Sequence, residues 1–181
     1  FYSYSKELIF GIVFLIFIAL LLNFFIELNI YVTSTVLLII LTFLIKFRNC
    51  YFNKKFITFS ILQSIFITIL ILESNVYRPD AGLYHLPYIG ILNSEKILIG
   101  LSNIHFRYGH TSIIQYLSAI HNNLINLDNG IVFAQALVAS SVILSFFYQL
   151  KNYSKLQNYN FHFYYLLFTS IYIAYKMNRY S

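Results

Sequence analysis

Five long apolar runs, separated by shorter polar stretches, dominate the chain. They cover Leu8–Ile26, Ile30–Ile45, Phe56–Leu72, Ile131–Tyr148 and Phe161–Tyr175. Most approach the roughly 20 apolar residues that a helix needs to cross a hydrocarbon core of about 30 Å. The pattern therefore predicts an all-α polytopic membrane protein with about five transmembrane helices.

The composition supports this class. The chain is 59% hydrophobic and 10% charged, with a mean hydropathy of +0.70, whereas soluble domains are about one quarter charged. We expect a single membrane domain over residues 1–181. Because the sequence starts at Phe1 and stops at Ser181, soon after an apolar run, we also expect it to be a fragment of a longer chain.

The basic residues indicate an orientation rather than a nucleic-acid surface. The net charge is +6, but Lys and Arg occur in short tracts between apolar runs and not as one cluster. The densest tract, Lys46, Arg48, Lys54 and Lys55, predicts a cytoplasmic loop by the positive-inside rule. The N-terminus is then cytoplasmic, and residues 73–130 are extracytoplasmic.

Polar chemistry is concentrated in this extracytoplasmic segment, between three spans in residues 1–72 and two in residues 131–181. It holds four of the five histidines, together with the acids Glu73, Asp80, Glu95 and Asp128. The spans themselves carry no charged residue, which disfavours a transporter or proton pump, since those place ionisable groups at membrane depth.

Two parts of the segment have helical character. From Thr111, a candidate N-cap, the sequence TSIIQYLSAIHNNLI places Ile113, Leu117, Ile120 and Leu124 on one face and Gln115, Ser118 and Asn122 opposite. An earlier helix can begin at Pro79-Asp80, with Pro87 as an interruption. Both are predicted to be short interfacial helices.

The turn between these helices, Gly100 to His110, carries the donors His105, Arg107 and His110. The planar fork of Arg107 suits bidentate binding of a phosphate. A salt bridge from Arg107 to Asp80, Glu95 or a lipid headgroup explains the residue equally well.

Asp80 also has two interpretations. An Asp that follows Pro and precedes Ala-Gly is a common helix cap or turn former. In a helix, however, Asp80 and Tyr84 share a face at i,i+4, and His85 follows. A carboxylate, a phenol and an imidazole placed together form a site able to remove a proton from a hydroxyl nucleophile.

A metal site is not predicted. His105 and His110 are poorly spaced for two ligands on one helix, and the sequence has no His-Glu-x-x-His pattern. The single cysteine, Cys50, excludes an internal disulfide and disfavours a thiolate cluster. A hard divalent cation held by Asp80 or Glu73 with a phosphate stays an open alternative.

These motifs resemble a family of bacterial polytopic membrane proteins related to the GT-C glycosyltransferases. Such proteins show an Asp-x-x-x-Tyr-His element followed by a Gly-Leu-Gly-Asn-Leu-His-Gly-Arg-Phe-Gly-like segment. The positions kept here are Asp80, Tyr84, His85, Gly100, Leu101, Asn103, His105, Arg107 and Gly109. The chain departs from the pattern at Ser102 and Phe106, where glycines are expected.

The resemblance implies a bacterial cytoplasmic-membrane enzyme that transfers a sugar from a polyprenyl-phosphate donor to an extracytoplasmic acceptor. It implies that Asp80, with Tyr84 and His85, forms the catalytic group. His105 and Arg107, with Asn103 and His110, would bind the phosphate. The expected partners are membrane lipids and the lipid-linked sugar. The alternatives are a glycan polymerase or ligase that relies on Arg and His, and a non-enzymatic lipid-linked transporter or assembly subunit.

Overall fold

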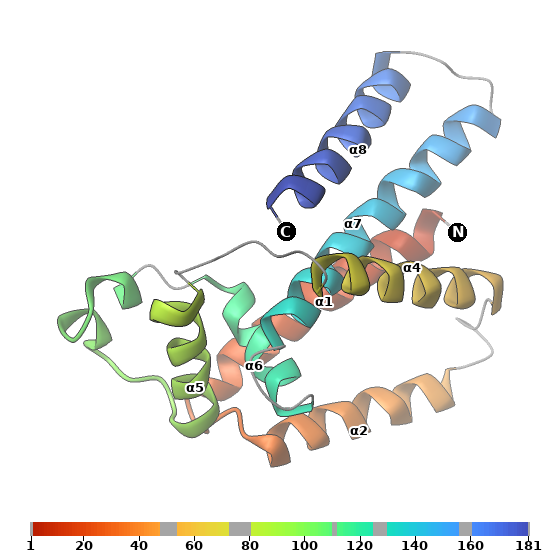
Figure 1. Cartoon of the computed structure of the whole chain (residues 1–181). Coiled ribbons are helices and arrows are strands. Elements are labelled where there is room, and N and C mark those ends of the chain that lie inside the picture. Colours follow the sequence, from red (N-terminus) through yellow and green to blue (C-terminus); the bar gives the residue numbers. More distant parts are fainter. Residues whose placement is uncertain are drawn as a thin grey trace. The chain divides into compact units, whose positions relative to one another are not determined.

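The computed structural model describes residues 2–47, 54–72, 81–109, 112–124, 130–155 and 161–180, without the side chains of residues 2–5, 81, 130–131, 155 and 173–180. Over these residues the secondary structure is helical and contains no strand, as Figure 1 shows. The predicted all-α fold is therefore confirmed.

The five apolar runs all form helices. They are α1 (Tyr2–Asn23), α2 (Ile30–Lys46), α4 (Lys54–Leu72), α7 (Gly130–Lys155) and α8 (Phe161–Tyr180). Three described stretches are long and apolar enough to cross a membrane: Lys6–Asn23, Lys54–Leu72 and Val132–Ser154. Helix α2 is also apolar but has only 17 residues, and α8 becomes polar near its end, at Lys176, Asn178 and Arg179.

Shorter helices lie between α4 and α7. A π-helical turn, η1 (Ala81–His85), leads into α5 (Leu86–Ser94), and two 3₁₀ turns, η2 (Leu101–Asn103) and η3 (Phe106–Gly109), precede α6 (Ile114–Leu124). Pro87 is the second residue of α5 and comes directly after the π-helical turn. Because proline has no N–H, the interruption expected at Pro87 falls where the π-helical turn gives way to α5.

The chain divides into two compact units, and both α1 and α7 contribute to each. The first unit contains residues 1–12, 54–76 and 135–181; the second contains residues 13–53 and 77–134. In the first unit, α4 packs on α7 through Phe56, Leu144 and Tyr148. Ser140 adds polar contacts, because its carbonyl accepts from Gln63 Nε2 at 3.3 Å and its hydroxyl lies 3.2 Å from Ser64 Oγ.

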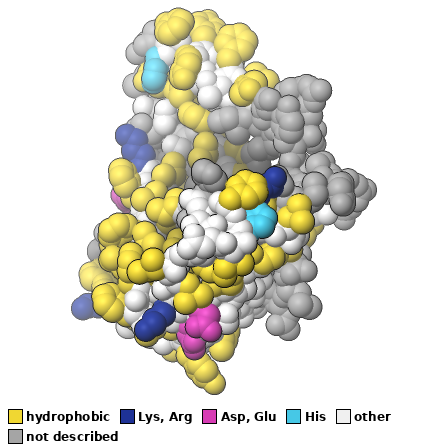
Figure 2. Space-filling view, turned by 90° about the vertical axis from the view of Figure 1, so that its left-hand side faces the viewer, with side chains coloured by type: hydrophobic (Ala, Val, Ile, Leu, Met, Phe, Trp, Pro, Cys, Tyr) yellow, Lys and Arg dark blue, Asp and Glu magenta, His cyan; other side chains and the backbone are white. Residues whose placement is uncertain are grey.

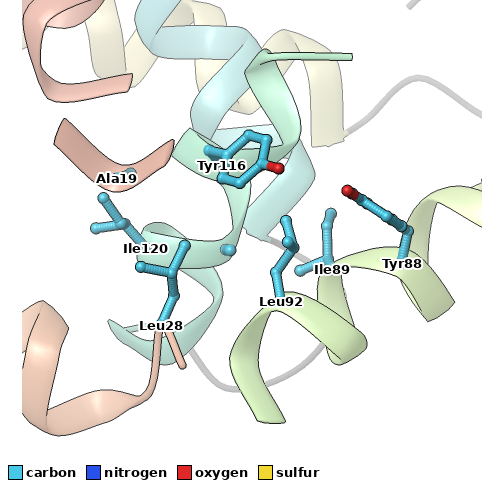
Figure 3. Packing of buried hydrophobic residues seen from close by; sticks show 8 residues of the cluster. Ala19, Leu28, Tyr88, Ile89, Leu92, Tyr116 and Ile120 are labelled. Atoms are coloured by element: carbon cyan, nitrogen blue, oxygen red, sulfur yellow. The ribbon is translucent and has the colours of Figure 1, made fainter. Parts of the chain in front are cut away.

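The core of the second unit joins the α1–α2 turn to α5 and α6 (Figure 3). Its buried members are Ala19, Leu28, Tyr88, Ile89, Leu92, Tyr116, Ala119 and Ile120. They come from segments far apart in the sequence, so α5, α6 and the α1–α2 hairpin share one core.

Polar contacts hold the α1–α2 turn in this core. The N–H of Leu28 donates to the Leu92 carbonyl at 2.9 Å. The Leu28 carbonyl accepts from Asn93 Nδ2 at 2.8 Å and from Asn123 Nδ2 at 2.6 Å. Asn123 Nδ2 also donates to Thr33 Oγ1 at 2.9 Å. Amides of α5 and α6 thus satisfy a backbone group of the turn that would otherwise be buried and unpaired.

Asn23 explains why α1 ends three residues before the predicted end of its span. Its side chain is fully buried, and Nδ2 donates to the carbonyls of Ile26 and Glu95 at 3.3 and 3.1 Å. The next helix begins at a cap, because Asn29 Oδ1 accepts from the N–H groups of Tyr31 and Val32.

Candidate functional site

The predicted site residues that the structure describes all lie in the second unit, in η1 and in the η2–η3 turn. Tyr84 and His85 end η1. Asn103 ends η2, and Arg107 lies in η3, two residues after His105. Asp80 and His110, the other two predicted members, lie outside the described residues.

The two segments meet at Arg107. Its guanidinium carbon lies over the Tyr84 ring, 4.9 Å from the centroid, and 5.7 Å from the centroid of Phe106. The ring of Tyr84 is in turn 4.2 Å from that of His85. A guanidinium on an aromatic face is held there by the ring quadrupole. Arg107, Tyr84 and His85 therefore form one cluster.

His85 is held by a residue of α6. The N–H of Ser112 donates to Gln115 Oε1 at 2.9 Å, which fixes the amide orientation, because a backbone N–H can only donate. The Nε2 amide of Gln115, 2.8 Å from His85 Nδ1, is therefore the donor in that contact. In neutral His85 the proton is then on Nε2.

His105 has the same tautomer. Its Nδ1 accepts the backbone N–H of Arg107 at 3.3 Å, so neutral His105 also carries its proton on Nε2. Its ring stacks on Phe106 with centroids 5.1 Å apart. Phe106, which replaces an expected glycine, thus supplies a ring to both His105 and Arg107.

The η2–η3 turn depends on one glycine. Gly100 has a φ of +89°, a left-handed conformation that other residues adopt at a cost. Its carbonyl accepts the N–H of Asn103 at 2.9 Å. Ser102 occupies the other position where a glycine is expected. Its side chain fits beside Gly109, because even a Cβ added to Gly109 would lie 3.5 Å from Ser102 Cβ, an ordinary van der Waals distance.

Beside this cluster, the second unit contains a pocket of about 220 Å³. Its lining residues are Tyr88, Ile91, Leu92, Lys96, Ile97, Leu98, Gly100, Leu101, Ser102, Tyr108, Gly109 and Tyr116. None of the five predicted site residues that the structure describes lines it. The cluster and the pocket are nevertheless neighbours, because the Tyr108 ring lies 5.6 Å from His105 and 5.9 Å from Tyr88.

Two titratable groups of α6 have shifted pKa values. Burial, together with a hydrogen bond to Tyr88, raises the pKa of Tyr116 far above its ordinary value. Burial lowers the pKa of His121, and the hydrogen bond from its Nδ1 to the Leu117 carbonyl at 2.8 Å opposes this shift in part. Tyr116 is therefore a neutral phenol at neutral pH, and burial favours neutral His121.

The described residues contain no group of three or more His, Cys, Asp or Glu side chains that could hold a metal ion.

Comparison with known families gives one match. Residues 1–179 match the family described as a domain of unknown function, DUF8201. The chain belongs to this family. No curated protein and no solved structure matches it. The description of DUF8201 gives no activity, so a function for this chain has to be argued from its own residues.

Sequence reasoning missed two contributors in this DUF8201 chain. Gln115 was placed on the polar face of an interfacial helix, but Gln115 and Ser118 are buried together with the apolar residues between and after them. The expected separation of an apolar and a polar face is wrong here, because α6 packs against both α5 and α2. The Ser-x-x-Gln spacing of Ser112 and Gln115, typical of a capping box, was the available signal.

The pocket tyrosines are the second omission. Tyr88, Tyr108 and Tyr116 are spread over three elements. Their sequence spacing follows no motif, so only the packing of α5 on α6 brings them together.

Proposed function

We propose that this chain belongs to a membrane glycosyltransferase that transfers a sugar from a polyprenyl-phosphate donor to a hydroxyl acceptor outside the bacterial cytoplasmic membrane. The observation that carries the proposal is the contact of Arg107 with Tyr84. It joins the two motifs that resemble GT-C enzymes into one cluster, in a chain that also has helices long and apolar enough to cross a membrane.

The cluster has the donors that the reaction needs. As the bond from the sugar C1 to the phosphate oxygen breaks, its electron pair passes to that oxygen, and the charge is stabilised by fixed N–H donors. The guanidinium of Arg107 and the Nε2–H groups of His85 and His105 are such donors.

The acceptor side of the reaction needs a base. The acceptor oxygen forms the new bond to C1 and releases its proton to a carboxylate, the role that the resemblance assigns to Asp80. Such a base typically contributes about 10²- to 10⁴-fold in rate. Asp80 lies four residues before Tyr84 in the sequence, which supports its place at the same cluster.

Membrane vesicles from cells that express the protein test the proposal, with transfer from radiolabelled polyprenyl-phosphate sugars as the readout. We expect Asp80→Asn to lose about a hundredfold or more in rate at unchanged expression, and Arg107→Ala to lose a comparable factor. Arg107→Lys keeps the positive charge but loses the planar guanidinium that can donate two parallel hydrogen bonds. We expect this variant to be more active than Arg107→Ala but less active than the wild type. Lys151→Ala, at an exposed position of α7, is the control.

The alternatives give different patterns. In a glycan polymerase or ligase that relies on Arg and His, Arg107→Ala is severe and Asp80→Asn mild. Wild-type rates in both variants would contradict the proposed site, and would favour a non-enzymatic subunit.

The proposed orientation has its own test. Cys50 is the only cysteine and lies in the loop expected to be cytoplasmic. We expect a membrane-impermeant maleimide to leave the wild-type protein unlabelled in intact cells, and to label the variant Cys50→Ser/Ser94→Cys. Labelling of Cys50 in intact cells would reverse the topology.

A further inference from the structure

The pocket of the second unit is small and has mixed walls. At about 220 Å³ it lies below the roughly 300–1,000 Å³ of pockets that hold drug-sized ligands. Figure 2 shows the surface of one face of the molecule, where hydrophobic side chains, among which tyrosine is counted, predominate. In the pocket, three tyrosines, a serine and a lysine line the wall together with aliphatic side chains, so the wall combines apolar groups with hydroxyls and one positive charge.

The tyrosines combine apolar rings with hydroxyl groups. Tyr88 and Tyr116 are buried, and their hydroxyl groups point toward each other (Figure 3). Tyr108 adds a ring 5.9 Å from that of Tyr88. A sugar ring suits such walls, because its C–H face packs on an aromatic ring while its hydroxyls exchange hydrogen bonds with phenols. A purely apolar ligand would leave these hydroxyls without new partners.

Lys96 adds a positive charge to the pocket wall. It lies in the irregular segment between α5 and η2, and its side chain is exposed. An ammonium group is a common partner of phosphate as a point charge. The ligand that satisfies both the tyrosines and the lysine is a sugar that carries a phosphate.

We infer that this pocket binds one hexose phosphate, with the sugar ring among Tyr88, Tyr108 and Tyr116 and the phosphate toward Lys96. The inference rests on the proposed function and deepens it, because the same chemistry is present in a soluble hexose 1-phosphate and in the head of a polyprenyl-phosphate hexose. Tyr108 lines the pocket and follows Arg107 directly in η3, so the pocket adjoins the Arg107 cluster.

Binding is measured on the purified protein in lipid nanodiscs by saturation-transfer NMR. The probes are the 1-phosphates of glucose, mannose and galactose, the free hexoses, and inorganic phosphate. We expect at least one hexose 1-phosphate to bind more tightly than its free hexose and than phosphate alone. Absence of binding by all three hexose 1-phosphates at millimolar concentration overturns the inference.

Two variants locate the binding. Ser102→Leu fills the pocket, and Ser94→Leu, an exposed serine of α5 outside the pocket, is the matched control. We expect Ser102→Leu to abolish hexose phosphate binding and Ser94→Leu to retain it. Lys96→Met should weaken hexose phosphate about tenfold, the effect of losing one charged hydrogen bond, but leave free hexose unchanged. Lys151→Met is the control for charge.

Two further measurements test where the ligand binds and whether its source is soluble or lipid-linked. If Tyr108→Leu and Ser102→Leu, with unchanged circular dichroism and thermal unfolding, bind hexose phosphate as the wild type does, the ligand lies elsewhere and the inference is wrong. A farnesyl-phosphate hexose that binds through the same residues more tightly than the 1-phosphate identifies the lipid-linked source; equal binding identifies the soluble one.

The inference and the proposed function fail separately. If Ser102→Leu abolishes sugar-phosphate binding, the inferred ligand of the pocket is supported, even when Arg107→Ala leaves the transfer rate unchanged. If the transfer rate depends on Arg107 but Ser102→Leu leaves the KM for the donor unchanged, the proposed function is supported and the inferred ligand of the pocket is wrong.

Discussion

Helices α2 and α6 belong to the same unit, yet the more apolar helix, α2, is the less buried of the two. Helix α2 is apolar almost throughout, but among its residues only Thr33 is buried. Helix α6 contains Gln115, Ser118 and other polar residues, and every side chain from Gln115 to Ile120 is buried. In a soluble protein the apolar helix would form the core. Here we interpret the exposed side chains of α2 as the surface that meets lipid.

Core leucines test the comparison with the largest expected effect. Leu117 in α6 is fully buried, whereas Leu41 in α2 is 52% exposed. We expect Leu117→Ala to cost about 2–5 kcal/mol of unfolding free energy through a cavity. Leu41→Ala should change it by about 0.5 kcal/mol or less. Reversible unfolding in detergent measures both, and similar losses would show that α2 is as closely packed as α6.

A pair of threonines on α2 sharpens the comparison within one helix. Thr33 Oγ1 is buried and accepts from Asn123, whereas Thr42 Oγ1 donates to the Leu38 carbonyl of its own helix. We expect Thr33→Val to cost about 1–3 kcal/mol, because Asn123 loses a buried partner, and Thr42→Val to be nearly neutral. A double-mutant cycle with Asn123→Ala should show coupling for Thr33 only.

The tautomer of His85 tests whether Gln115, a buried polar residue of α6, orients His85 in the candidate site. In Gln115→Glu a carboxylate replaces the amide donor, so Nδ1 of His85 has to carry a proton to keep the contact. We expect ¹⁵N chemical shifts to show Nε2–H in the wild type and Nδ1–H in the variant. His105, whose partner is the backbone of Arg107, is the internal control and should not change.

Acidification is expected to give the smallest effect. Burial lowers the pKa of His121 in the native state, whereas in the unfolded chain the pKa has its ordinary value of about 6.5. When the pH is below about 6.5, the unfolded chain therefore binds a proton at His121 more readily than the native state does. Stability is therefore lost as pH falls through that value toward the native pKa. We expect thermal unfolding between pH 7.5 and 5.5 to shift less in His121→Gln than in the wild type. An unchanged shift would assign the pH dependence to other groups; His162→Gln is the control.

The helices could be predicted because apolar run length is a local signal. The structure places helices on all five runs. The end of α1 could not be predicted from its own run. It depends on Asn23 meeting the Glu95 carbonyl, a contact between residues far apart in the sequence.

The site was partly predictable for the same reason. Its motifs named Tyr84, His85 and Arg107, and packing of separate elements brings these three together. The role of Gln115 was not predicted, because helical periodicity alone assigned it to a polar face. Which face of a helix is covered is decided by its neighbours, and those are set by the tertiary fold.

The hydrogen bonds around Leu28 also constrain how the protein is made. The turn that follows the first helix receives its partners from Leu92, Asn93 and Asn123. At about 5–20 residues per second, a ribosome adds these roughly 3–20 s after Leu28. Until then the α1–α2 turn is incomplete, and the Leu28 carbonyl has to hydrogen-bond to water. A chain that stalls before Asn123 would present this unfinished turn to quality-control proteases.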